Sequence, residues 1–131
     1  MSVHDLKKQA ARASVVLTNG EVAATALDIS KAGNMAVHDA QVRVRADFTV
    51  GNLTNVIIRG YSSQDGTTYD LMYGEGGLAA IYTLTATDTV TITLPRADGS
   101  NYVRVTAQGT GDFTGSLLAL DYHWLRKGTQ I

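Results

Sequence analysis

The chain has 131 residues, no cysteine and a formal net charge of −1, with 11 basic and 12 acidic side chains. This length fits one domain, because two independent cores would each fall near the size at which burial becomes marginal. The absence of cysteine excludes disulfides, thiolate zinc sites and cysteine nucleophiles. The balanced charge argues against nonspecific electrostatic binding to nucleic acid or to an anionic membrane.

The first residues do not predict secretion. Residues 1–14 contain two lysines, but no apolar run follows them, and no stretch approaches the roughly 18 apolar residues of a membrane span. We therefore expect a protein made in the cytoplasm, and the absence of cysteine agrees with assembly in a reducing compartment.

Residues 4–13 (HDLKKQAARA) are good helix formers in a short polar run. An isolated helix of this length is marginal, so we expect either an arm that reaches a neighbouring subunit or one short helix, with a frayed terminus as the alternative. We accordingly take residues 1–13 as an N-terminal arm and residues 14–131 as a single domain.

From residue 14 onward, short β-type runs alternate with turn residues, as in a sandwich or barrel. Residues 14–18 and 21–29 flank Asn19-Gly20, a dipeptide suited to a type I′ turn, which predicts a first hairpin. Residues 40–50 form the clearest half-buried strand, because polar and apolar side chains alternate along it. Its apolar face would hold Val42, Val44, Ala46, Phe48 and Val50.

Residues 55–62 and 67–73 enclose a loop around Gln64-Asp65-Gly66 and should pair as adjacent antiparallel strands. The glycine-rich residues 74–77 (GEGG) neither follow a buried parallel strand nor lead into a helix. We interpret them as a flexible connection rather than as a phosphate-binding loop.

Four further strands are predicted, and the total reaches about eight or nine. Pro95 sits at the end of one of them, where a missing backbone donor does little harm. No amphipathic helix separates the runs, so the crossovers of a parallel sheet are absent and we predict an all-β, antiparallel two-sheet β-sandwich. Eight strands match a jelly roll, and an immunoglobulin-like Greek key stays open. The four runs are residues 80–85, 89–94, 100–107 and 115–124.

Candidate catalytic and metal-binding groups are sparse. His4, His38 and His123 are scattered without a spacing typical of zinc. We assign no catalytic, cofactor-binding or metal-binding residue, and we expect that the protein is not an enzyme. Asp65 and Asp98 precede glycine, which favours a role in turns. A calcium site would need distant loops to bring together several acids, namely Asp65, Asp70, Glu75 and Asp112.

Arginine and tyrosine residues in the predicted strands raise two binding hypotheses. A basic stripe is one, although interspersed acids such as Asp47 and the balanced total charge favour cross-strand pairs or a protein interface. A carbohydrate platform is the other, and it requires Tyr69, Tyr73 or Trp124 to lie exposed beside a groove, whereas aromatic residues are also common in strands and at protein interfaces. The arginines are Arg43, Arg45, Arg59 and Arg104, and the remaining tyrosines are Tyr61, Tyr82, Tyr102 and Tyr122.

Two stretches carry a family resemblance. Residues 54–73 combine a strand, a Ser-x-Asp-Gly-Thr-Thr turn and an aromatic-bearing return strand, and residues 100–122 combine Asn-Tyr-Val-Arg-Val, a glycine-rich turn and a closing strand. Together they resemble the small β-sandwich virion proteins of tailed bacteriophages. The resemblance implies a jelly-roll-like fold that decorates or cements a capsid, or occurs in necks, tails and fibres, often as a trimer. It supplies no catalytic residues.

The expected function is therefore that of a phage virion structural protein, most simply a capsid decoration or cement subunit on the capsid surface. Its partners would be the major capsid protein or other virion proteins and further copies of itself, with a trimer favoured and with no nucleic acid, membrane or cofactor. Residues 1–13 and 124–131 are the expected contact segments. The alternatives are a carbohydrate-binding module and a tail, fibre or neck component.

Overall fold

The computed structural model describes residues 4–28, 42–95 and 100–127, and the side chains of 4–8, 28 and 124–127 lie outside that description. Over the described residues the chain forms ten strands, all paired antiparallel, and one short 3-10 turn. The fold is thus all-β, as predicted. No helix in this part of the chain is long and apolar enough to cross a membrane.

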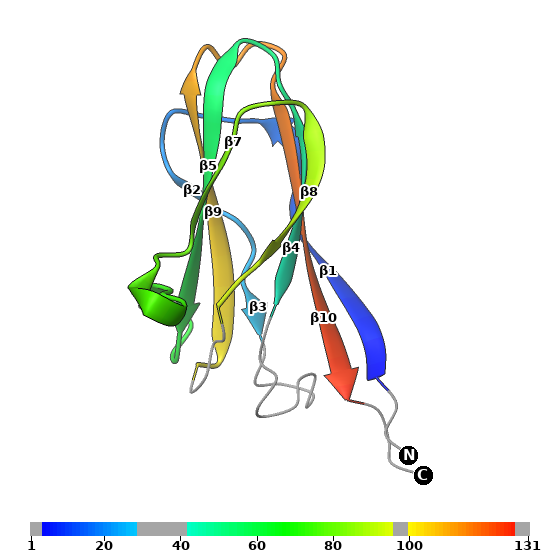
Figure 1. Ribbon diagram of the computed structural model, residues 1–131, viewed down its shortest axis with the longest axis vertical. Helices are drawn as coiled ribbons and strands as arrows, with labels where there is room; N and C mark the ends of the chain where they lie inside the picture. The colour runs from blue at the N-terminus through cyan, green and yellow to red at the C-terminus, as the bar shows by residue number, and fades with distance from the viewer. Residues whose placement is uncertain (1–3, 29–41, 96–99, 128–131) are drawn as a thin grey trace.

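The strands form two sheets that face each other across one core (Figure 1). The first sheet has the order β1 (His4–Val16), β10 (Leu117–Lys127), β4 (Arg43–Thr49) and β8 (Asp88–Thr93). The second sheet is built around the central pair β9 (Tyr102–Gly111) and β5 (Leu53–Ser63). Short strands flank this pair, with β2 (Val22–Ala23) and β3 (Leu27–Asp28) on β9, and β6 (Asp70–Leu71) and β7 (Ile81–Leu84) on β5.

The strand order is that of a jelly roll. Because β2 and β3 share β9 as partner, and β6 and β7 share β5, the ten strands occupy 10 − 2 = 8 positions. The first position then pairs with the eighth, the second with the seventh, the third with the sixth and the fourth with the fifth. This arrangement confirms the predicted jelly-roll-like sandwich and differs from an immunoglobulin-like order.

Alternating side chains from both sheets fill the core. On β4 every second residue is buried, so Val44, Ala46 and Phe48 face inward as predicted. Ile58 on β5 and Val105 on β9 meet them from the opposite sheet, and both are fully buried. The same two-residue period leaves Arg43, Arg45 and Asp47 on the outer face of the first sheet.

Tyr122 ties the two sheets together by hydrogen bonds. It lies on β10 in the first sheet and is completely buried. Its hydroxyl donates to the carbonyl oxygen of Thr25, at 2.7 Å, and accepts from the N–H of Val105 on β9, at 3.1 Å. Burial raises the pKa of Tyr122, so the phenol stays protonated and keeps its donor.

The N-terminal residues form a strand, and the expected short helix is wrong. Residues 4–13 belong to β1, which continues without a break through the expected boundary at residue 13 and pairs with β10 along its length. Good helix propensity is a weak preference, and the ladder offered by a long neighbouring strand overrides it here.

The predicted first hairpin is also wrong. Residues 14–16 lie in β1 in the first sheet, whereas Val22 and Ala23 lie in β2 in the second sheet. Asn19-Gly20 therefore lies in a crossover between the sheets, and Gly20 is not among the glycines with positive φ. The other predicted pairing, of residues 55–62 with 67–73, is confirmed, and β6 is the paired part of the second run.

Candidate functional site

The segment between β6 and β7, residues 73–79, forms an ordered protrusion that we call the apolar loop. The N–H of Gly74 donates to the carbonyl of Leu78, at 2.7 Å, and the N–H of Gly77 donates to the carbonyl of Gly74, at 3.1 Å. A β-bridge joins Tyr73 to Ala79 at its base. Gly76 and Gly77 both adopt φ 75°, a conformation that favours glycine. The loop is thus a hydrogen-bonded turn.

This loop holds large apolar side chains in water. Leu78 is 74% exposed and Tyr73 is 62% exposed, and Ile81 at the start of β7 is also exposed. Glu75 lies exposed in the turn between them. Clustered exposed apolar groups are typical of protein contact sites, and a fixed backbone lowers the entropy that docking would cost. The apolar loop is therefore a candidate contact surface.

A second exposed apolar group lies where β1 ends and β10 begins, and we call it the β1–β10 patch (Val15, Val16 and Leu117). Val15 is 48% and Val16 51% exposed, and Val16 pairs directly with Leu117. Register shifts on either side of Arg12 interrupt the alternation of β1. Such irregularities change the direction in which side chains point, and here the consecutive residues Val15 and Val16 are both exposed to solvent.

Arg12 organises the backbone beneath this patch. Its guanidinium donates to the carbonyls of Val15 and Val16, each at 3.0 Å, and to that of Leu118. Burial lowers the pKa of Arg12 below its ordinary value, but a guanidinium remains charged in proteins. The patch consequently combines exposed apolar side chains with one positive charge.

A polar network centred on Glu21 crosses the outer face of the second sheet. Its carboxylate accepts hydrogen bonds from the hydroxyls of Tyr61 and, at 2.6 Å, Thr106, and it lies 3.8 Å from the guanidinium of Arg59. Arg59 in turn donates to the side-chain carbonyl of Gln108, at 2.9 Å. Partial burial alone would raise the pKa of Glu21, but these bonds and cations lower it below the ordinary value. The network ties three segments of the sheet together.

The four arginines of the suspected basic stripe lie on different sheets. Arg43 and Arg45 are exposed on β4, whereas Arg59 and Arg104 alternate with buried residues of β5 and β9 and so face outward from the second sheet. Arg104 stacks over the ring of Tyr69, 3.8 Å from its centroid. The geometry therefore contains no continuous stripe of these four residues.

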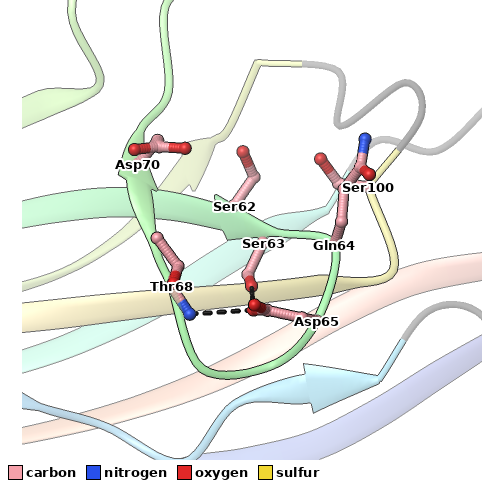
Figure 2. Close-up of a pocket in the computed structure, with 7 residues that line it drawn as sticks. All are labelled: Ser62, Ser63, Gln64, Asp65, Thr68, Asp70 and Ser100. Atoms are coloured by element: carbon pink, nitrogen blue, oxygen red, sulfur yellow. Dashed lines mark hydrogen bonds between the residues drawn. The ribbon is translucent and has the colours of Figure 1, made fainter.

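A shallow depression of about 450 Å³ lies at the end of β5, lined by polar side chains (Figure 2). Asp65 does not project freely into it, because its carboxylate accepts from the N–H groups of Thr68 and Thr67, each at 2.8 Å, and from the Ser63 hydroxyl, at 3.0 Å. These bonds lower the pKa of Asp65. Asp65 thus stabilises the predicted Asp-Gly turn, in which Gly66 adopts φ 78°. The lining residues are Ser62, Ser63, Gln64, Asp65, Thr68, Asp70 and Ser100.

The acids considered for calcium do not converge. Asp112 accepts from the N–H of Thr114, at 3.0 Å, and from its hydroxyl, at 2.8 Å, in the turn after β9, whereas Asp65 follows the far end of β5. No group of three or more His, Asp or Glu side chains that could hold a metal ion occurs in the parts of the chain described above. Asp98 lies outside the described residues.

The remaining candidates are dispersed. His123 lies on β10 opposite Arg43 and Lys8, His38 lies outside the described residues, and His4 is described only by its backbone in β1. Trp124 likewise has a described backbone and no described side chain. Among the tyrosines of the sugar-platform hypothesis, Tyr73 is well exposed, while Tyr69 is partly covered by Arg104.

Sequence reasoning located residues 74–77 but missed the two apolar surfaces. Exposure of Leu78 was not foreseeable from local pattern, since an apolar residue after GEGG fits the start of a buried strand equally well. A usable signal for the second surface was the pair Val15-Val16, which breaks the alternation expected of a half-buried strand.

Comparisons with known proteins find similarity in fold only. No protein-family model and no curated protein matches this sequence. Among solved structures, the SPBc2 prophage-derived protein YomS superposes with a TM-score of 0.54 at 11% identity, covering 93% of this chain and 96% of that one. A chain of Bacillus endospore appendages, described as a novel family of disulfide-linked pili, also gives a TM-score of 0.54, at 14% identity, covering 99% of this chain and 92% of that one.

Proposed function

We propose that this chain is a non-enzymatic structural subunit of a virion or a comparable extracellular assembly, and that it works by docking on other protein surfaces. The observation that carries the proposal is the apolar loop, where an ordered backbone holds Leu78 and Tyr73 in solvent. Exposed apolar side chains grouped on one loop are typical of protein contact sites.

Two lines of comparison support an assembly role. The jelly roll is shared over nearly the whole chain with a prophage-derived protein and with a subunit of endospore pili. The 131-residue sequence has no cysteine, so its contacts would differ from the disulfide links named for the pili.

Within this class we favour a decoration or cement subunit of a phage capsid, acting as a homo-oligomer. The support is the sequence resemblance of residues 54–73 and 100–122 to phage virion proteins, together with the prophage origin of one structural neighbour. Partners would be the major capsid protein and further copies of this chain.

A tail, fibre or neck component with a carbohydrate-binding role is the second candidate. One specific observation favours it, namely the exposure of Tyr73 on a fixed loop, since a tyrosine ring can stack on a sugar. A glycan screen with wild type and Tyr73→Ala distinguishes this role, because only sugar binding predicts a glycan signal that Tyr73→Ala abolishes.

Binding to capsid shells tests the favoured role. Purified chain is mixed with expanded shells that lack decoration, and shell-bound protein is quantified after sedimentation. We expect stoichiometric binding by wild type and at least a tenfold loss of affinity for Leu78→Asp, because a buried carboxylate at the contact is costly. Thr91→Asp, on the exposed face of β8, is the control and should bind like wild type. Shells that take up no protein would contradict the capsid role.

A further inference from the structure

We propose that the apolar loop of one copy docks on the β1–β10 patch of the next copy, so that the chain assembles head to tail with itself. This inference rests on the proposed role as an assembly subunit and names the partner of its contact surface. Both surfaces expose large apolar side chains: Tyr73 and Leu78 on the loop, with Ile81 beside it at the start of β7, and Val15, Val16 and Leu117 on the patch.

Charge complementarity favours this pairing over loop against loop. The loop carries the carboxylate of Glu75, so two loops brought together would place like charges side by side. The patch carries the guanidinium of Arg12, which donates hydrogen bonds to backbone carbonyl oxygens of β1 and β10. Carbonyl oxygens are neutral, so Arg12 keeps its positive charge. A loop that approaches the patch therefore brings the carboxylate of Glu75 toward an oppositely charged group.

The positions of the two surfaces determine the type of assembly. The apolar loop adjoins β5 near Gly60, toward the end of that strand, and belongs to the second sheet. The patch lies in the first sheet beside Thr49, where β4 ends, which is the opposite end of the sandwich. In Figure 1 the green coil of the loop lies low on one sheet and the arrowhead of β1 lies high on the other.

The loop lies at the β6–β7 edge of the second sheet and the patch at the β1 edge of the first sheet, at opposite ends of the sandwich. The two surfaces therefore face away from each other, and one copy does not turn both toward the same partner around a two-fold axis. They make a heterologous contact, in which each copy uses its loop on one neighbour and its patch on another. Repetition of this contact closes into a ring, such as a trimer, if the rotation between copies permits, and otherwise gives a filament.

The contact is small. Three large apolar side chains on each surface fall short of the roughly 20–30 residues a side of a standard interface. A single contact should therefore be weak and concentration-dependent, and a closed ring or an attachment to a shell would strengthen it because each copy is then held at two places.

Two complementary variants of the 131-residue chain test the pairing. Leu78→Asp disables the loop and keeps the patch, and Val16→Asp disables the patch and keeps the loop. Sedimentation velocity should show wild type growing into larger species as its concentration rises, while each variant alone stays a monomer of about 13.9 kDa. An equimolar mixture of the two variants should give a dimer, because one intact loop and one intact patch remain.

Val22→Asp is the matched control, since Val22 is an exposed valine on β2 of the second sheet outside both surfaces. It should assemble like wild type, and near-ultraviolet circular dichroism of all variants checks that each is folded. Three outcomes overturn the inference: wild type that stays monomeric, variants that assemble like wild type, or a mixture without dimer. Shell binding by wild type is measured separately, so the inference can fail while the proposed function stands.

Discussion

At the scale of single residues, Tyr122 shows how a polar atom is accommodated in an apolar core. Its ring lies among the buried residues of both sheets, and its hydroxyl has both a donor and an acceptor as partners. Buried polar groups are tolerated when they are hydrogen-bonded and are costly when they are not. The tyrosine consequently fixes the segment around Thr25 and strand β9 relative to β10.

Replacing Tyr122 by phenylalanine should destabilise the fold while preserving its shape. The substitution leaves the N–H of Val105 and the carbonyl of Thr25 without these partners, and a buried unsatisfied group costs about 1–3 kcal/mol. We expect the free energy of unfolding in urea to fall by that amount. Tyr73→Phe, which removes a hydroxyl from an exposed ring, should change it by less than about 0.5 kcal/mol. Equal effects of the two substitutions would contradict this role of Tyr122.

At the scale of elements, two turns are packed together at the end of the sandwich where β5 begins. The N–H of Gly51 donates to the hydroxyl of Ser116, at 2.9 Å, and the N–H of Asn52 donates to the carbonyl of Thr114, at 3.2 Å. A Cβ at Gly51 would lie 2.3 Å from the Thr114 carbonyl oxygen, which is closer than two atoms can approach. Glycine is needed here for space, so that the turn before β5 can contact the turn before β10.

Gly51→Ala should therefore lower the thermal stability markedly. Overpacking against backbone costs about 1–3 kcal/mol, which corresponds to a Tm lower by roughly 3 °C or more. Gly20→Ala serves as the comparison, because a Cβ there would meet no atom within 4 Å and the residue has no positive φ. Calorimetry that finds the two variants equally stable would refute the packing argument.

The same elements show what local sequence could and could not predict. The period-two pattern of β4 and the Asp65-Gly66 turn depend on neighbouring residues, and both were predicted correctly. The strand β1 depends on its pairing with β10, more than a hundred residues away, so its local helix propensity was misleading. Asn19-Gly20 fits a hairpin turn locally, but pairing with β10 and β9 places its two flanks in different sheets.

The candidate site was harder to predict than the fold, for a related reason. Burial of a strand face follows from alternation, whereas the exposure of Val16 or Leu78 depends on what the rest of the molecule leaves uncovered. Turn-forming acids such as Asp65 could be identified in advance because their partners lie within a few residues.

At the scale of the whole molecule, the jelly roll presents apolar surfaces at opposite ends, one on each sheet. Its interior is closed by the two sheets, and the polar groups of the Glu21 network are engaged with one another. A molecule built in this way is suited to repeated protein contacts. Assembly should depend on concentration, because a single contact of this size is weak.

The mass of the wild-type protein in solution, measured by multi-angle light scattering across a wide concentration series, tests this account most directly. We predict a mass that rises from 13.9 kDa in dilute solution to a defined multiple or a growing series at high concentration. A mass of 13.9 kDa at every concentration would contradict self-assembly through these surfaces.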